Sequence, residues 1–313
     1  VNAAQRAFPA WSRLKPSQRA AWLNRLADAV EARFEDFVKC ESRNTGKPLS
    51  LLRTVEIPRT IANFRFFAAQ CQLTLDQAFH GEAGMNYTLH QALGTVGVIS
   101  PWNLPLYLLS WKLAPALAAG NCVIAKPSEI TPLSADLLAQ TAQAIGFPAG
   151  VLNIVQGAGD TVGAALVAHP SVKAISFTGS TQVGGQIALQ CARQFKKLTL
   201  EMGGKNPAIV FADAPDNTVS ELLRASFQNS GQICLCSSRL LIERSSYEAF
   251  KRDFVARLES MVIGAPDDPS TQLGPVMSKA HFDKVMSYIA MAKQEGGNVL
   301  CGGQALALPG DNA

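Results

Sequence analysis

The sequence contains no apolar stretch suited to crossing a membrane, no cluster of like charges and no low-complexity tract. The longest apolar stretch, residues 104–119, is interrupted by Pro105, Lys112 and Pro115, so it does not predict a membrane span. No hydrophobic leader follows a basic start, which argues against a secretory signal. The 28 basic residues only slightly exceed the 24 acidic ones and are scattered, so nucleic-acid binding is not expected.

Residues that could bind a metal or form disulfides are few and irregularly spaced. The four histidines stand alone, without the spacing of metal ligands, so we expect no metal site. Seven cysteines are an odd number at irregular intervals, which indicates reduced thiols in a cytoplasmic compartment. These cysteines are Cys40, Cys71, Cys122, Cys191, Cys234, Cys236 and Cys301.

The composition is that of an ordinary globular protein, with 48% hydrophobic and 17% charged residues in a chain of 313, long enough for two domains. Short apolar runs alternate with helical patterns before residue 202, which predicts an α/β fold with a mostly parallel sheet covered on both faces. The expected strands are Thr95–Ile99, Cys122–Ala125, Leu152–Val155, Ala174–Phe177 and Leu198–Leu200.

Helix signals flank these strands. Ser17 is the expected cap of one long helix that Gly46 and Pro48 close, and Ile57, Ile61 and Phe64 predict a second helix. Thr131 and Pro132 are typical of a cap and first turn for the helix between the second and third strands.

A second block begins after Gly203-Gly204, so we expect one domain over residues 1–202 and another over residues 203–313. Its predicted elements are a strand at Ala208–Phe211, a helix at Thr218–Phe227, a strand at Leu240–Ile242 and helices near residues 246–261 and 278–296.

Two motifs pair a carboxylate with a thiol. Glu201 lies in Leu-Glu-Met-Gly-Gly-Lys-Asn-Pro, and Cys234 ends Phe-Gln-Asn-Ser-Gly-Gln-Ile-Cys. A cysteine reacts as thiolate, and Gly231 permits a tight turn that presents the sulfur. Glu201, at the end of a strand, is expected to be partly buried with a raised pKa suited to activating water. The alternatives are a buried apolar cysteine, the interpretation we keep for Cys236, and a solvated or capping glutamate.

Two further loops follow strands, where α/β folds bind ligands. Asn103 in Ser-Pro-Trp-Asn can donate to an oxyanion, or it can simply be a turn residue. Lys126 and Glu129 can both reach one ribose, and a carboxylate there favours NAD over NADP. Glycines near residues 157–163 and 179–184 suit phosphate or adenine loops, although plain turn geometry also accounts for them.

Together these motifs resemble the signatures of the NAD(P)-dependent aldehyde dehydrogenase superfamily. The resemblance implies a Rossmann-like cofactor domain and an α/β catalytic domain. It also implies that Cys234 attacks an aldehyde, Asn103 holds the oxyanion, hydride passes to NAD, and Glu201 directs water at the thioester. The cofactor residues that it implies are Ile99, Ser100, Pro101, Trp102, Lys126, Ser128, Glu129, Gly159, Gly163, Phe177, Gly179, Ser180, Val183 and Gly203.

Within that superfamily, Ile57-Pro58-Arg59, residues 63–67 and residues 231–236 are most similar to 2-aminomuconic and 2-hydroxymuconic semialdehyde dehydrogenases. Their substrates carry carboxylates, which guanidinium binds well, so Arg59 is the first candidate ligand and Arg65 the second. A solvated arginine remains an equal alternative for either position.

The resemblance also has gaps. The Glu-x-Phe-Gly-Pro segment, the final catalytic elements, the oligomerisation strand and the opening strands of the sheet are not found, so we expect a central portion of such an enzyme. The resemblance implies a homo-oligomer, dimer or tetramer, at full length. Two alternatives stay open: oxidation of an aliphatic or betaine-type aldehyde, and a non-catalytic fragment that binds nucleotide or a partner chain.

Overall fold

The computed structural model describes residues 1–73 and 75–306, which form two compact units. The first unit comprises Val1–Asn44 and Arg53–Met202, and the second comprises Thr45–Leu52 and the chain from Gly203 onward. The chain passes from the first unit to the main part of the second between Met202 and Gly203. The short segment Thr45–Leu52 groups with the second unit instead of the first, because the Leu49 amide donates to the Pro266 carbonyl at 2.9 Å.

A five-stranded sheet forms the centre of the first unit. The strands are β3 (Thr95–Ile99), β4 (Cys122–Lys126), β5 (Leu152–Ile154), β6 (Val172–Gly179) and β7 (Lys197–Met202). They are ordered β5-β4-β3-β6-β7, and every neighbouring pair is parallel. The predicted α/β class is confirmed, and each of the five predicted strands forms. β3 and β4 are buried along their whole length, which explains their uninterrupted apolar sequences.

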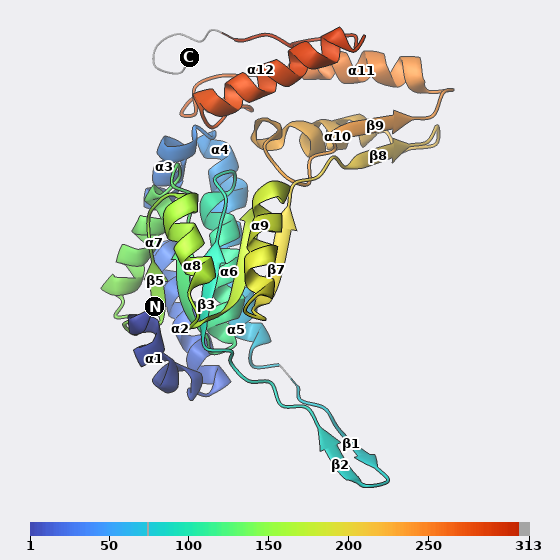
Figure 1. Cartoon of the computed structure of the whole chain (residues 1–313). Coiled ribbons are helices and arrows are strands. Elements are labelled where there is room, and N and C mark those ends of the chain that lie inside the picture. The colour runs from blue at the N-terminus through green and yellow to red at the C-terminus, as the bar shows by residue number, and fades with distance from the viewer. Residues whose placement is uncertain (74, 307–313) are drawn as a thin grey trace. The chain divides into compact units, whose positions relative to one another are not determined.

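Helices that connect the strands cover the sheet. They are α6 (Pro105–Ala118), α7 (Leu133–Ala144), α8 (Ala164–Ala168) and α9 (Thr181–Ala192), with a π-helical turn at Gly159–Gly163 before α8. α6 packs on β3 and β4, while α8 and α9 pack on β6. Figure 1 shows α9 alongside β7, which it also contacts. Since parallel crossovers are right-handed, the reversal of strand order at β3 puts α6 and α7 on one face and α8 and α9 on the other.

The helices at the N-terminus differ from the prediction. They are α1 (Asn2–Ser12), α2 (Pro16–Ala32), α3 (Phe34–Thr45) and α5 (Ile57–Gln70), and a π-helical turn, Leu52–Glu56, follows the short α4 (Leu49–Leu51). The single long helix capped by Ser17 was wrong. Lys15 is the N-cap and Pro16 opens α2, because the fixed φ of proline suits a first turn. The backbone leaves helical geometry at Arg33, which separates α2 from α3. The second prediction is confirmed, since Ile57, Ile61 and Phe64 are all buried in α5.

α3 supplies the missing caps of two helices of the sheet. The Glu41 carboxylate accepts from the Leu106 amide of α6 at 3.2 Å, and the Asn44 side chain accepts from the Leu133 amide of α7 at 3.0 Å. Neither α6 nor α7 has a capping bond from the side chain of its own N-cap residue. The predicted cap at Thr131 was therefore wrong, because α7 begins at Leu133 and a residue distant in sequence satisfies its first amide.

A hairpin of β1 (Ala78–Gly81) and β2 (Gly84–Tyr87) extends from the first unit (Figure 1). All its strand residues are exposed, so the sequence carries no inward and outward alternation that would reveal the strands.

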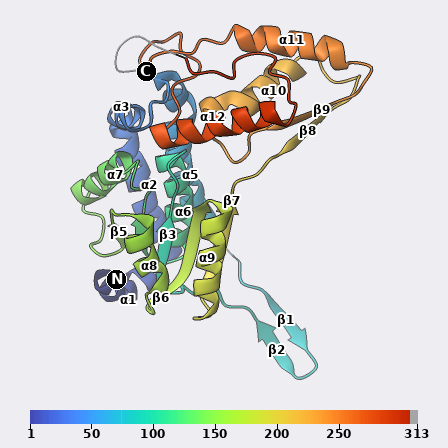
Figure 2. The ribbon, with the colours of Figure 1, turned by 45° about the horizontal axis from the view of Figure 1, so that its top comes forward.

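The second unit contains the other predicted elements. They are β8 (Pro207–Val210), α10 (Thr218–Phe227), the 3₁₀ turn Gln228–Gly231, β9 (Arg239–Ile242), α11 (Tyr247–Glu259) and α12 (Lys279–Gln294). β8 and β9 pair in parallel, as Figure 2 shows. The rings of Phe227 and Phe254, 6.3 Å apart, join α10 to α11. Across both units, no helix of residues 1–73 and 75–306 combines the length and apolarity that a membrane crossing requires.

Candidate functional site

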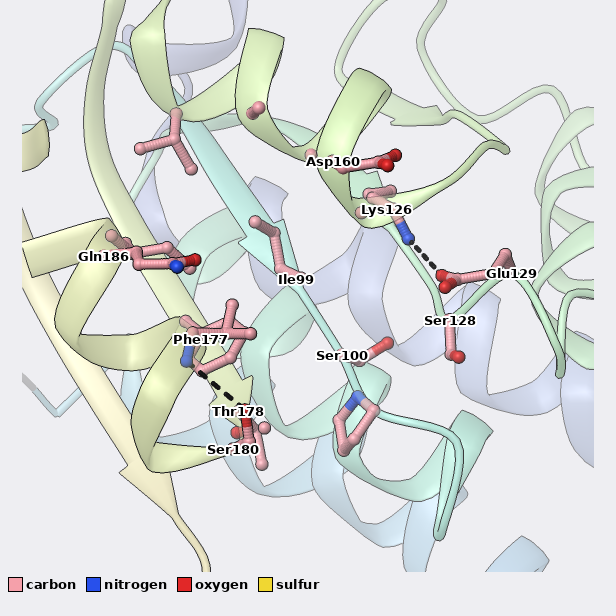
Figure 3. Close-up of a pocket in the computed structure, with 18 of the residues that line it drawn as sticks. Ile99, Ser100, Lys126, Ser128, Glu129, Asp160, Phe177, Thr178, Ser180 and Gln186 are labelled. Carbon is pink, nitrogen blue, oxygen red and sulfur yellow. Dashed lines mark hydrogen bonds and ion pairs between the residues drawn. The ribbon is translucent and has the colours of Figure 1, made fainter. Parts of the chain in front are cut away.

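A cleft of about 700 Å³ lies in the first unit at the carboxyl ends of β3, β4 and β6 (Figure 3). The strand order reverses at this point, which is where open parallel sheets bind nucleotides. All the predicted cofactor residues except Gly203 line the cleft. They are Ile99, Ser100, Pro101, Trp102, Lys126, Ser128, Glu129, Gly159, Gly163, Phe177, Gly179, Ser180 and Val183. Gly203 belongs to the second unit and is not part of this lining.

An ion pair stands at one side of the cleft. The buried Lys126 ammonium donates to the Pro127 carbonyl at 2.8 Å and to the Glu129 carboxylate at 3.1 Å (Figure 3). Half of the Glu129 side chain stays exposed. Partial burial would raise the pKa of Glu129, but a backbone hydrogen bond and Lys126 together lower it below its ordinary value. An ionised carboxylate held in this way is a suitable acceptor for ribose hydroxyls and repels phosphate.

The start of α9 forms another side of the cleft. Ser180 is its N-cap and accepts from the Val183 amide at 3.3 Å, so the first amides of a 12-residue helix face the cleft end of β6. Gly179 is required there because a Cβ would lie 2.4 Å from Cζ of the Phe177 ring. A helix start approached by bare backbone is a favourable position for a pyrophosphate.

Some residues that line the cleft were not predicted from the sequence motifs. They are Asp160, Ala164, Val167, Ala168, Thr178, Gln186, Ile187 and Gln190. Ala164, Val167 and Ala168 lie on one face of α8. On α9, Gln186, Ile187 and Gln190 continue the three- and four-residue spacing that begins at Val183. That helical spacing could have identified them, because residues so spaced share one helix face.

Cys234 lies in the second unit, after a turn of unusual backbone. Asn229, Ser230 and Gly231 have φ values of 53°, 54° and 75°, three consecutive residues in the left-handed region. The chain thus makes a tight turn at Gly231, and the two preceding residues share its left-handed conformation. Cys234 is half-buried, whereas Cys122, Cys191 and Cys236 are buried.

The cysteines other than Cys234 lie in surroundings that disfavour the thiolate. All seven are free thiols, and burial raises the pKa of six of them, to about 11 for Cys40 and Cys122. The same cause raises the pKa of Cys71, Cys191, Cys236 and Cys301. Cys236, two positions after Cys234, is buried, in agreement with a structural role.

Glu201 is the penultimate residue of β7 and lies in the first unit. The expectation that it is partly buried was wrong: the residue is exposed, because β7 is the last strand in the sheet order. It lines a second cavity of about 390 Å³, together with Trp111, Lys112 and Ser176. The Lys112 ammonium donates to the Ser176 hydroxyl at 3.0 Å. Burial lowers the pKa of Lys112 to about 8, and the negative charge of Glu201 opposes that shift.

Asn103 lies in the loop between β3 and α6, half-buried, with its carbonyl oxygen inaccessible to solvent. Both ends of the loop are held: the Ser100 amide donates to the Lys126 carbonyl at 3.2 Å, and Glu41 accepts from Leu106. The loop that carries Asn103 is therefore anchored independently of any ligand.

The two candidate arginines have different surroundings. Arg65 is bound to Asp28 at 3.0 Å and Glu31 at 2.6 Å, so its charge is already neutralised by α2. The Arg59 guanidinium instead lies 5.3 Å from the ring centroid of Trp111, which lines the second cavity. Arg59 is the better placed of the two to receive a carboxylate. No group of three or more potential metal ligands occurs in the part of the chain that the structure describes.

Comparison with known proteins agrees with this arrangement. The profile of the aldehyde dehydrogenase family matches residues 1–312. The chain belongs to the aldehyde dehydrogenase family. It is 50% identical to 2-aminomuconic semialdehyde dehydrogenase of Danio rerio and 47% identical to that of Homo sapiens, covering all of this chain and 65% of each relative. It is 44% identical to 2-hydroxymuconic semialdehyde dehydrogenase of Pseudomonas sp. (strain CF600), again over the whole chain and over 66% of that protein.

Solved structures show the same similarity. PnpE in complex with nicotinamide adenine dinucleotide superposes with a TM-score of 0.95 at 43% identity, over 97% of this chain and 63% of that one. An NAD⁺ complex of an aldehyde dehydrogenase from Bacillus cereus gives a TM-score of 0.96 at 35% identity, over 99% of this chain and 64% of that one. The chain therefore spans about 65% of the length of the first curated relatives it matches.

Proposed function

We propose that the protein containing this chain oxidises an aldehyde to a carboxylic acid with NAD as the oxidant. The observation that carries the proposal is the cleft at the reversal of strand order, with the Lys126–Glu129 pair on one side and the start of α9 on another. The family relationship and the half-buried position of Cys234 after the left-handed turn support the same activity.

NAD fits the residues present. Glu129 would accept from a ribose hydroxyl, Lys126 would stand beside it, and the amides after Ser180 would face the pyrophosphate. The ionised Glu129 would repel a ribose 2′-phosphate, so NADP is the weaker candidate. When bound, NAD supplies the two-electron oxidation that none of the protein side chains can perform.

The remaining chemistry falls to side chains of the protein. Cys234 adds its thiolate to the aldehyde carbon, and the amide of Asn103 donates to the oxygen that becomes negative. After oxidation the acyl group is a thioester on Cys234. Glu201 takes a proton from the water that hydrolyses this thioester, which releases the acid and restores the thiol.

The substrate that we propose is a semialdehyde carrying a carboxylate, such as 2-aminomuconate semialdehyde. The relatives named above act on such compounds by their names. In this chain Arg59 would supply the cation, because its guanidinium lies 5.3 Å from the ring centroid of Trp111, a residue that lines the second cavity, and guanidinium can bind a carboxylate bidentately. We also propose a cytoplasmic location, which suits seven unpaired cysteines, and a homo-oligomeric assembly.

Nucleotide binding tests the cleft on the chain itself. Titration calorimetry should show binding of NAD, with NADP at least about tenfold weaker because of its added charge. Glu129→Gln should reduce this difference by weakening NAD and relieving the repulsion of NADP. Equal affinity of the unchanged chain for both dinucleotides would remove Glu129 from the proposal.

Turnover tests the thiol in the complete protein, by the absorbance of NADH. Cys234→Ala should abolish oxidation, while Cys236→Ala, which removes the neighbouring buried thiol, serves as its matched control. Turnover that survives in Cys234→Ala would refute the mechanism. A complete unchanged protein that binds NAD but oxidises no aldehyde would favour a non-catalytic nucleotide-binding protein.

The two arginines can be separated with a panel of aldehydes. Arg59→Ala should raise KM for semialdehydes carrying a carboxylate by about 10- to 100-fold, and leave aliphatic aldehydes unaffected. Arg65→Ala should have little effect on either group, because its partners are Asp28 and Glu31. An equal loss for both groups of aldehydes in Arg59→Ala would argue for an aliphatic or betaine-type substrate.

A further inference from the structure

We infer that Asn206 is a positioning residue that holds the Cys234 turn in its reactive shape. Its side-chain amide donates to the Cys234 carbonyl at 2.7 Å and to the Cys236 carbonyl at 3.2 Å. One amide therefore bridges two carbonyls on either side of Leu235. All of these residues lie in the second unit, so the contacts belong to one compact body.

Asn206 is itself held by the backbone. It immediately precedes β8, and its carbonyl accepts from the Arg239 amide, at 3.3 Å, where β9 begins. The parallel pairing of Pro207 with Arg239 continues this contact into the two strands. The side chain thus projects from a fixed strand start, which gives its two hydrogen bonds a defined direction.

The turn before Cys234 needs such support. Asn229 and Ser230 occupy the left-handed region, which residues other than glycine leave unless their surroundings hold them there. On this side the Ser230 hydroxyl donates to the Gly274 backbone carbonyl at 2.7 Å, and the side-chain Oε1 of Gln232 accepts from the Met277 backbone amide at 2.9 Å. Residues 274–277 therefore hold the turn before the thiol, and Asn206 holds the backbone at and after it.

Gly204 makes room for this contact. A Cβ at position 204 would lie 2.9 Å from the Asn206 side-chain oxygen and 3.4 Å from its nitrogen. Any residue larger than glycine would press on the amide that donates to Cys234. The absence of a side chain at Gly204 thus leaves space for the Asn206 side chain.

The consequence for activity rests on the proposed function, in which Cys234 is the nucleophile. A reacting atom must be held close to its attack geometry, and a displacement of about 1 Å can cost about 10²-fold in rate. Asn206 would act through the Cys234 backbone, without touching substrate or cofactor. It would therefore affect the chemical step and leave nucleotide affinity unchanged.

Hydrogen exchange on the chain tests the contact independently of turnover. In Asn206→Ala, the amides of Cys236 and Ser237 should exchange at least about tenfold faster, because the backbone around Cys234 opens more often. Asn206→Asp keeps the size but replaces the donor with a carboxylate, and it should behave like the alanine variant. Asn217→Ala is the matched control, since Asn217 caps α10 without a side-chain bond. Unchanged exchange in both Asn206 variants would overturn the inference.

Kinetics of the complete protein separate this inference from the proposed function. Asn206→Ala and Gly204→Ala should each lower kcat by about 10- to 100-fold, with the dissociation constant of NAD within twofold of the unchanged protein. Loss of turnover in Cys234→Ala together with full turnover in Asn206→Ala would overturn the inference and leave the proposed function standing. Turnover retained in Cys234→Ala would overturn the proposed function alone, because faster exchange in Asn206→Ala would still establish the contact.

Discussion

The nucleotide cleft of the first unit and the Cys234 turn of the second unit are built in different ways. The cleft consists mainly of strand ends, a helix start and glycines, and Lys126 and Glu129 supply its one ion pair. The turn contains three left-handed residues, of which Ser230 is bonded to the distant Gly274 carbonyl, and the Asn206 side chain holds the backbone at Cys234. The first site follows from the topology of the sheet, and the second depends on individual hydrogen bonds. Changes in one should therefore leave the other intact.

The largest expected effect tests the hydrolysis step of the proposed function. Glu201→Gln should slow thioester hydrolysis by about 10²–10⁴-fold, because it removes a general base and keeps the size of the side chain. An acyl adduct should then accumulate on Cys234 and be visible by intact-protein mass spectrometry. A variant that turns over slowly without any trapped adduct would contradict the role assigned to Glu201.

The next effect concerns the cleft alone. Gly179→Ala would place a methyl group 2.4 Å from the Phe177 ring, an overpacking that typically costs about 1–3 kcal/mol. The dissociation constant of NAD should rise about tenfold or more, measured by calorimetry on the chain. Gly185→Ala is the control within α9, because its added methyl meets no atom within 4 Å. Equal losses in the two variants would indicate a general effect on α9.

A third measurement compares the thiols without any substitution. Burial raises the pKa of six cysteines, which lowers their thiolate fractions: Cys40, Cys71, Cys122, Cys191, Cys236 and Cys301. Because the proposed function makes Cys234 the nucleophile, native alkylation at pH 7.5 with about stoichiometric iodoacetamide should modify Cys234 at least about tenfold faster than these six. Peptide mass spectrometry gives the rate at each site. Faster modification of Cys301 or Cys40 would show that the turn does not present its thiol to solvent.

The smallest effect concerns the stability of the first unit. Burial lowers the pKa of Lys112 from 10.5 to about 8, so at neutral pH the folded state carries a charge that it disfavours. The unfolded chain binds more protons than the folded one between these values, so this cost is largest below pH 8 and declines as the pH rises toward 10.5.

Lys112→Met should therefore stabilise the chain by about 1–3 kcal/mol at pH 7, a gain that loss of the Ser176 bond partly offsets. Urea unfolding at pH 7 and pH 10 measures this difference, and the gain should shrink at the higher pH. A gain that is independent of pH would mean that packing, and not charge burial, limits stability at this position.

Local patterns were sufficient for much of the first unit. The strands of the sheet were predicted because buried parallel strands are continuous apolar runs, whereas the full set of cleft residues was implied by the resemblance to a known family. The predicted ends of the helices were less accurate. α2 stops at Ala32 instead of continuing, and α7 begins one residue after Pro132, because the Asn44 side chain from α3 satisfies its first amide.

The sequence by itself determined the α/β class, the order of the elements and the positions of Glu201 and Cys234 in their motifs, since each of these depends on neighbouring residues. Only the tertiary structure decided that Glu41 and Asn44 cap helices of the sheet, that Arg65 is already paired, and that Asn206 holds the Cys234 turn. These contacts join residues that are 28 to 89 positions apart. A hydrogen bond across such a separation leaves no periodic signal in the sequence, because it depends on where the folded backbone brings its two partners.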